Sequence, residues 1–329
     1  MIKALPPALV AFLLLLPPLV CSNYWLDVLN AIGVSAILAF SLNLIVGQAG
    51  MFHMGHAAFC AVGAYTTAIM NTALGTPVLW TMPLAGMAAG FFALLVARPI
   101  IHLRGDYLLL VTIGIVEIVR IALTQDIFGL TGGANGIAGI DRPYIFGFRI
   151  YKPSHFYWLI WGMAGVTIVL FSYLERSRFG RALNYIREDN LAADGIGINS
   201  AAYKLGAFVL GAFWAGMVGT ILVSKMTFVS PAFFTFWESV VLFVIVILGG
   251  AGNLKGVLLG AFLVTGLPEA FRDFEGMRMF CYGAAVILLM IFRPGGLLPS
   301  RPGDYNVAEF MKKLAGPAPN PRSGEDKRP

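Results

Sequence analysis

The sequence ERSRFGRALNYIREDNLAADGIGINSAAY, residues 175–203, is the longest polar interval in a chain that is otherwise nearly all apolar. Four arginines crowd its first half and three carboxylates follow them: Arg176, Arg178, Arg181, Arg187, Glu188, Asp189 and Asp194. A long apolar run precedes this interval and another follows it. The pattern predicts a polar loop between two membrane-spanning helices, available to a soluble partner.

The composition excludes an ordinary soluble domain. Hydrophobic residues make up 58% of the chain and charged residues 12%, with a mean hydropathy of +0.79. Soluble domains carry about 45–50% apolar and ~25% charged residues. The net charge of +6 does not indicate nucleic-acid binding, because the basic residues are scattered among the loops without interleaved aromatics. Cys21, Cys60 and Cys281 lack both metal-ligand spacing and a disulfide framework, and are expected to be small core residues.

A spanning helix needs roughly 20 mainly apolar residues. The apolar runs predict an all-α, polytopic membrane protein of about ten transmembrane helices, at residues 5–20, 24–46, 57–72, 78–101, 107–123, 156–174, 204–223, 236–250, 256–270 and 279–292. The run at 5–20 is either a retained helix or a cleaved signal peptide, and the absence of a small-residue cleavage site at Val20 and Cys21 favours retention. Residues 1–300 form the predicted transmembrane domain. The proline-rich, mixed-charge tail 301–329 is predicted to be disordered.

The distribution of basic residues orients these spans. With the amino terminus inside and ten spans, most of the 23 basic residues fall on the cytoplasmic side. This bias follows the positive-inside rule. It predicts that both termini and the loop at 175–203 are cytoplasmic.

The sequence GQAGMFHMGH, residues 47–56, separates the second and third predicted spans. Its glycines and polar side chains indicate either a discontinuous helix near 47–59, such as transporters place along their pathways, or an ordinary turn with Gly50 and Gly55 as helix caps. Gly63 and Ala64 continue a small-residue face suited to close helix packing. A similar sequence, GGAGNL at 249–254, also follows an apolar run, which is weak evidence for internal duplication.

Few side chains in the spans are polar enough to suggest chemistry. His53 and His56 lie three apart but lack a third ligand, so no metal site is predicted, and His56 is expected to be a hydrogen-bonded structural histidine. Glu117 and Arg120 are placed to pair along one helix, either as an ion pair that satisfies itself or with Glu117 in a pathway. Asn43 is a weaker pathway candidate. No catalytic set and no nucleotide-binding motif is present, so the chain is not expected to hydrolyse ATP.

The glycine-rich sequence TGGANGI, residues 131–137, is predicted to be an external loop. Gly132, Gly133 and Asn135 lie in it, but no Lys-Ser/Thr follows, so it does not match a phosphate-binding loop. Its glycines are expected to permit close backbone approach beside the outer mouth.

These segments together resemble the branched-chain amino acid ABC transporter permeases, the LivM-like family. The resemblance covers about residues 25–299 and rests on GxAGMFxMGHAAFxxxGAY (47–65), RGDY (104–107) with LxTxxxxEIVR (110–120), LTGGxNGI (130–137), SxxGRAL (177–183) with IRED (186–189), Ala192-Ala193 and GIN (197–199), and GGxG (249–252). His53 departs from the family, which more often has a small hydroxyl residue there, so its role is left open.

The resemblance implies an importer. A periplasmic substrate-binding protein delivers the substrate, this chain and a homologous LivH-like permease form the pathway, and two ABC ATPase subunits drive it from the cytoplasmic face of the inner membrane. In the loop, Gly180 and either Gly195 or Gly197 are expected to bracket a short helix carrying Ala192 and Ala193. Arg181 and Arg187 are expected to pair with the ATPase or with Glu188 and Asp189. The implied coupling residues are Gly180, Arg181, Ala182, Arg187, Glu188, Asp189, Ala192, Ala193 and Gly195. The alternative is that the arginines only fix topology and meet lipid phosphates.

The pathway candidates are Asn43, Gly50, Gly55, His56, Phe59, Tyr107, Thr112 and Glu117. The expected substrate is leucine, isoleucine, valine or a related small acid or amide, with urea and short amides as alternatives within the same frame. A stand-alone secondary transporter or channel is a rival, disfavoured because only Glu117 is an ionisable pathway candidate. An integral membrane enzyme is disfavoured by the missing catalytic set. No cofactor is expected. Whether the permeases form a homodimer or a heterodimer is left open.

Overall fold

The computed structural model describes residues 17–20, 22–103, 105–127, 129–145, 148–270, 283–284, 286–288, 291–293 and 295–299. The chain divides into a unit at Met1–Pro299 and a second unit at Ser300–Pro329 that lies outside the described residues. The predicted span at 5–20 falls mostly outside them, and the predicted span at 279–292 is described only in part.

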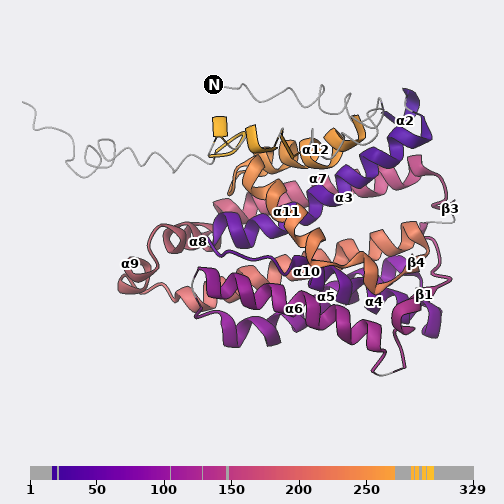
Figure 1. The fold of residues 1–329 in the computed structure, drawn as a ribbon, viewed down its shortest axis with the longest axis horizontal. Coiled ribbons are helices and arrows are strands. Elements are labelled where there is room, and N and C mark those ends of the chain that lie inside the picture. Colours follow the sequence, from indigo (N-terminus) through magenta and orange to yellow (C-terminus); the bar gives the residue numbers. More distant parts are fainter. Residues whose placement is uncertain are drawn as a thin grey trace, which may run out of the picture. The chain divides into compact units, whose positions relative to one another are not determined.

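The described part is a bundle of long helices with four very short strands (Figure 1). The helices are α2 (Pro17–Val20), α3 (Asn23–Asn43), α4 (His56–Leu74), α5 (Val78–Ile100), α6 (Asp106–Gln125), α7 (Pro153–Arg176), α8 (Arg178–Glu188), α9 (Asn190–Gly195), α10 (Ser200–Met226), α11 (Phe236–Gly249) and α12 (Leu254–Ala270). A π-helical turn, η1 (Leu44–Gln48), extends α3, and η2 (Gly133–Asn135) and η3 (Pro231–Phe233) are 3₁₀ turns. The strands pair antiparallel as β1 (Ile137–Ala138) with β4 (Phe228–Val229), and β2 (Tyr144–Ile145) with β3 (Phe148–Arg149).

Seven helices among the described residues are long and apolar enough to cross a membrane: 23–48, 56–74, 78–100, 106–125, 153–176, 200–226 and 231–249. Their positions agree with seven of the ten predicted spans. The predicted span at 256–270 corresponds to α12, which has 17 residues. The chain is therefore a multi-pass membrane protein, as its composition predicts.

Helix α10 is the centre of the bundle and packs against α3, α4 and α5. The helices approach closely because glycines face each other across the contact. A side chain at Gly63 of α4 would overlap the backbone of Gly216 on α10, and one at Gly219 would overlap the backbone of Cys60 and Ala64. The predicted small-residue packing face at Gly63 and Ala64 is thus confirmed.

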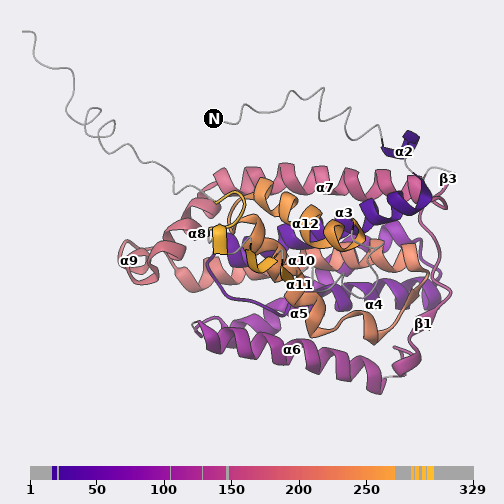
Figure 2. The same ribbon diagram turned by 45° about the horizontal axis from the view of Figure 1, so that its top comes forward.

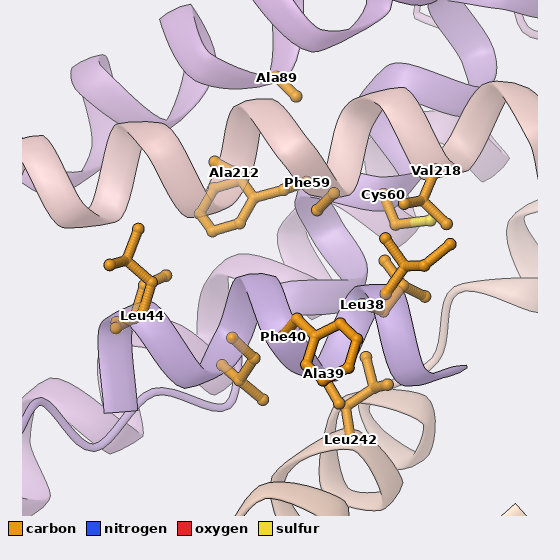
Figure 3. Packing of buried hydrophobic residues seen from close by; sticks show 14 of the residues in the cluster. Leu38, Ala39, Phe40, Leu44, Phe59, Cys60, Ala89, Ala212, Val218 and Leu242 are labelled. Carbon is orange, nitrogen blue, oxygen red and sulfur yellow. The ribbon is translucent and has the colours of Figure 1, made fainter. Parts of the chain in front are cut away.

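Large apolar side chains fill the space on either side of this contact. Figure 3 shows Phe59 of α4 beside Ala212 of α10, and Phe40 of α3 above Leu242 of α11. Phe59, Ala212 and Phe40 are fully buried. Alternating small and large residues let the helices pack at high density, which fixes the polar groups described next in a defined position.

The two ends of the bundle differ in character (Figures 1 and 2). One end carries α8 and α9 and is called here the α8 end. The other carries η2, the paired strands and η3, and is called the β1 end. The long helices run between the two ends.

Candidate functional site

The chain reverses inside the bundle between α3 and α4. After Gln48 the residues 49–55, called here the return segment, are not helical, and α4 begins at His56. Figure 1 shows this segment running from the α8 end back toward the middle of the bundle before α4 starts. His56 contacts Ser41, which lies seven residues before the end of η1 at Gln48. Seven helical residues correspond to roughly 10 Å along the helix axis. The amino terminus of α4 is therefore inside the bundle.

Three glycines make this path possible. Gly50 has a φ of +69°, a conformation that side chains with a Cβ rarely adopt. At Gly55 a Cβ would lie 2.8 Å from His53 Cε1 and 2.9 Å from the Thr112 carbonyl oxygen. A Cβ at Gly47 would overlap the backbone nitrogen of Gly252. The glycines in this segment are thus required by its fold, whichever role the segment has.

A group of buried polar side chains surrounds the start of α4, called here the histidine cluster: Ser41, His53, His56, Thr112 and Ser239. Ser41 Oγ lies 2.7 Å from His56 Nε2 and also donates to the Leu38 carbonyl oxygen. Because a hydroxyl has one hydrogen, His56 Nε2 donates to Ser41, and His56 Nδ1 is left as an acceptor without a partner among the described residues. His56 is a hydrogen-bonded buried histidine, as expected.

Helices α6 and α11 hold the return segment and α4 in place through this cluster. The backbone N–H of Met54 donates to Thr112 Oγ1 on α6 at 3.2 Å, and that of Ala57 donates to Ser239 Oγ on α11 at 3.0 Å. Of the candidates from the sequence, Gly55, His56, Phe59 and Thr112 come together here. Ser41 and Ser239 were missed, because single hydroxyls on apolar helices give no distinctive sequence signal.

His53 is the least satisfied member of the cluster. Its ring stacks on Phe59 with centroids 5.6 Å apart and meets Phe208 of α10 edge-on at 4.7 Å. The side chain is buried, and neither ring nitrogen has a hydrogen-bond partner among the described residues. Such groups in proteins normally bind ordered water or mark a functional site.

Asn43 links two segments that are far apart in the sequence. Its Oδ1 accepts from the backbone N–H of Gly252 at 2.8 Å, so the two similar sequences at 47–52 and 249–254 lie against each other. The π-helical turn η1 follows Asn43 directly. Asn43 is fully buried and its amide oxygen is already bonded.

The remaining pathway candidates lie on α6. Glu117 and Arg120 form the predicted ion pair, with Arg120 Nη2 2.7 Å from Glu117 Oε2, and more than a third of each side chain is exposed. Tyr107 is 73% exposed. Among the described residues, no hydrogen bond or ion pair links Glu117, Arg120 or Tyr107 to the histidine cluster. Helix α6 therefore presents Thr112 to the bundle and these three residues to its outside.

Glu238 is a polar residue that sequence reasoning missed. It lies in the first turn of α11, next to Ser239 and roughly 16 Å of helix from the end at Gly249. It is exposed at the bundle surface, and among the described residues its carboxylate has no hydrogen bond or ion pair. The sequence does carry a signal, since Glu238 is an ionisable residue within an apolar run.

The polar interval at 175–203 folds into two helices instead of one. Ser177 caps α8 by accepting from Gly180 N, and Asp189 caps α9 by accepting from the N–H groups of Leu191 and Ala192. Gly180 therefore lies in the first turn of α8, against the carbonyl of Leu174. The expected short helix carrying Ala192 and Ala193 is α9, which ends at Gly195, but it begins after Asp189 and not at Gly180, because Asp189 caps it and separates it from α8.

The charged residues of this region bond within the chain. Arg181 donates to the Arg176 carbonyl at 2.7 Å, and Arg187 donates to the Gly47 carbonyl at 2.5 Å. Among the described residues Arg187 forms no ion pair with Glu188 or Asp189, and the alternative, pairing with the ATPase, stays a prediction. Ala182 and Ala193 are buried, whereas Arg181, Glu188, Ala192 and Gly195 are exposed. Leu191 and Ile196 add exposed apolar surface at 67% and 71%.

The glycine-rich loop lies at the β1 end. Gly132, Gly133 and Gly136 have positive φ, and a side chain at Gly136 would overlap the Val229 carbonyl. The glycines thus allow the close backbone approach that the sequence predicts. Asp126 accepts from both the N–H and the hydroxyl of Thr131, which lowers the pKa of this carboxyl below its usual value. Asn135 is exposed on η2.

Comparison with known proteins agrees with a transport fold. Residues 24–292 match the family model described as branched-chain amino acid transport system / permease component. The high-affinity branched-chain amino acid transport system permease protein LivM of Escherichia coli K12 is 37% identical over 305 residues, covering 86% of this chain and 72% of that protein. A probable branched-chain amino acid transport permease protein LivM of Methanocaldococcus jannaschii is 25% identical, covering 82% of this chain and 92% of that protein. The ribose import permease protein RbsC of Haemophilus influenzae is 22% identical, covering 81% of this chain and 83% of that protein. No solved structure matches the chain.

The bundle and its membrane spans define a multi-pass α-helical membrane protein of the permease type. The chain belongs to the permease-component family of the branched-chain amino acid transport systems.

Proposed function

We propose that this chain is one permease subunit of a binding-protein-dependent ABC importer for branched-chain amino acids, in the inner membrane. The observation that carries the proposal is the family match over residues 24–292, together with 37% identity to a LivM permease. A homologous LivH-like permease completes the pathway, two ABC ATPase subunits supply energy, and a periplasmic binding protein delivers the substrate. Ten transmembrane spans result when the predicted spans at 5–20 and 279–292 and helix α12 are added to the seven spanning helices of the described residues.

The α8–α9 pair is the proposed contact with the ATPase. Leu191, Ala192 and Ile196 present an apolar surface on and just after the short α9, and exposed apolar side chains at an end of a bundle favour a protein partner. The basic residues around this end (Arg176, Arg178, Arg181, Lys204 and Lys255) support its assignment to the cytoplasm. The tail 301–329 would then also be cytoplasmic.

The proposed pathway wall is formed by the outer faces of α6 and α11 and by the return segment. Charged groups facing lipid in mid-membrane are costly. The partly exposed pair Glu117–Arg120, and the carboxylate of Glu238, which has no hydrogen bond or ion pair among the described residues, are therefore expected to face the second permease or the aqueous path. Phe52 of the return segment contacts Phe243 of α11 and is half exposed, which extends the same wall.

Copurification and transport test the proposal. The chain, coexpressed with the other permease and the ATPases, is expected to retain the ATPase during purification and to support leucine uptake in proteoliposomes only when the ATPase and ATP are present. Leu191→Asp with Ile196→Asp should remove the ATPase, whereas Phe148→Asp, at an equally exposed site at the β1 end, should not. Leucine uptake that persists without the ATPase would instead identify a secondary transporter.

A further inference from the structure

Arg187 sits between two segments that are far apart in the sequence. Its Nη1 donates to the carbonyl oxygen of Gly47 at 2.5 Å, across 140 residues. Its side-chain stem packs on Gly50, where an ideal Cβ would lie 3.0 Å from Arg187 Cγ. The residue thus binds the last turn of η1 and the first residues of the return segment at once.

The Gly47 carbonyl is a suitable acceptor for a cation. It lies in the last turn of a helix, where carbonyls lack intrahelical partners and the helix dipole is negative. The N–H groups that follow bond elsewhere, Ala49 to Leu44 and Met51 to Ile45. Arg187 therefore supplies the cap that the backbone leaves open.

On its other side Arg187 is close to α9 along the chain. It is the penultimate residue of α8, and only Glu188 and Asp189 separate it from α9, with Asp189 fixed as the cap of that helix. A cavity of about 310 Å³ lies beside Arg187, lined among others by Phe52, Leu108 and Lys204, and gives the side chain and the return segment room to move. If α9 moves, the Arg187 side chain is therefore placed to move Gly47 and Gly50 with it.

The return segment leads from this contact to the histidine cluster. Met54, seven residues after Gly47, bonds to Thr112, and His56 bonds to Ser41. We propose that Arg187 is a positioning residue that transmits motion of the α8–α9 pair to the return segment and the histidine cluster within this chain, and does not contact the ATPase. The inference rests on the proposed function and names the route from the ATPase contact to the pathway.

The test uses the complete importer with its ATPase and binding protein in proteoliposomes, with leucine uptake and ATP hydrolysis measured together. In Arg187→Gln the ATPase should still copurify and hydrolyse ATP, whereas leucine taken up per ATP hydrolysed should fall about tenfold, the size of effect expected when a charged hydrogen bond is lost. Arg187→Lys should recover part of the ratio, because an ammonium can still donate to the Gly47 carbonyl. Arg142→Gln is the matched control and should behave as the wild type, because it also removes an arginine-to-carbonyl hydrogen bond, to Tyr151 at 3.1 Å, but lies between β1 and β2 at the β1 end.

A pair of glycine variants separates backbone strain from contact with Arg187. Gly50→Ala and Gly75→Ala both place a side chain at positive φ, at +69° and +62°, but a Cβ at Gly75 has nothing within 4 Å. Only Gly50→Ala should lower the uptake-to-hydrolysis ratio. Loss of the ATPase from the purified Arg187→Gln complex would overturn the inference in favour of docking, and a wild-type ratio in that variant would also overturn it. A wild-type complex that fails to assemble or to transport would instead refute the proposed function.

Discussion

At the residue scale, buried polar atoms set the position of α4. Ser41, Thr112 and Ser239 each accept one hydrogen bond from the His56 ring or from the backbone beside it, across helices that are otherwise apolar. Hydrogen bonds in the low-dielectric interior of a bundle are directional, whereas the surrounding aliphatic contacts are not. The histidine cluster therefore fixes the depth within the bundle at which α4 begins. Apolar packing alone would not fix this depth.

Ser41→Ala tests this role. The change leaves His56 Nε2 buried without an acceptor, so we expect the free energy of unfolding to fall by about 1–3 kcal/mol. Thermal unfolding of the purified permease in detergent measures it. Thr66→Val is the control, because the Thr66 hydroxyl bonds only to the Val62 carbonyl in its own helix. Equal melting temperatures for the two variants would show that the Ser41–His56 bond does not position α4.

The loop after α6 should respond to acid through Asp126. Its pKa is lowered by the N–H and hydroxyl of Thr131, so the stabilisation is present above the unfolded value and is lost as the pH falls through the lowered pKa. We expect the hydrogen-exchange protection factor of the Thr131 amide to be constant near neutral pH and to fall on acidification below the usual value of 3.8. Asp126→Asn should abolish this pH dependence. A fall that persists in Asp126→Asn would assign it to another group.

At the element scale, the sequence predicts the long helices well and the segments between them poorly. The run predicted at 78–101 is α5 at Val78–Ile100, because only a helix buries twenty consecutive apolar residues with all backbone groups bonded. The polar interval was read as a loop, although Phe179, Ala182, Leu183 and Ile186 follow the helical spacing that α8 displays. The sequence at 47–56 predicts a break, as a discontinuous helix or as a turn, but not the path of residues 49–55 back into the bundle. That path depends on Thr112 and Ser239, which lie 58 and 182 residues from their partners.

The crossing of α4 and α10 depends on the absence of side chains. Gly63→Val would force the backbones apart at Gly216, so we expect a cost of about 3 kcal/mol or more and a sharp loss of folded protein. Gly162→Val on α7 is the matched control, because its Cβ would meet nothing within 4 Å. The yield of monodisperse protein after size-exclusion chromatography in detergent compares the two. Similar yields would contradict close packing at this crossing.

At the scale of the whole molecule, the polar groups divide between the two ends and the middle. The α8 end carries the amphipathic α8 and the exposed surface of α9, and the β1 end carries the glycine-rich loop. Two helices, α4 at His56 and α11 at Phe236, begin between these ends. This arrangement fits an importer in which the energy source and the binding protein act at opposite faces. The fold alone does not define that function, which rests on the family match.

Glu238 is the residue of the proposed pathway that can be tested most directly. In an importer of amino acids, a carboxylate within a membrane span, which here has no hydrogen bond or ion pair among the described residues, is suited to the substrate ammonium group. With saturating binding protein, Glu238→Gln should lower the maximal rate of leucine uptake about tenfold, and Glu238→Asp should retain most of it. ATPase copurification should be unchanged in both. A wild-type rate in Glu238→Gln would remove Glu238 from the pathway.

The orientation of the chain decides which end meets the ATPase, and cysteine labelling tests it. In a background without Cys21, Cys60 and Cys281, single cysteines are placed at Leu191 on α9 and at Phe148 on β3, which are 67% and 79% exposed. A membrane-impermeant maleimide added to cells with a permeabilised outer membrane should label Phe148→Cys at once and Leu191→Cys only after the inner membrane is opened. The excess of basic residues at the α8 end is the physical reason, because positively charged loops are retained in the cytoplasm. Labelling in the reverse order would place α9 outside, where no ATPase could reach it, and would refute the coupling roles of α9 and Arg187 together.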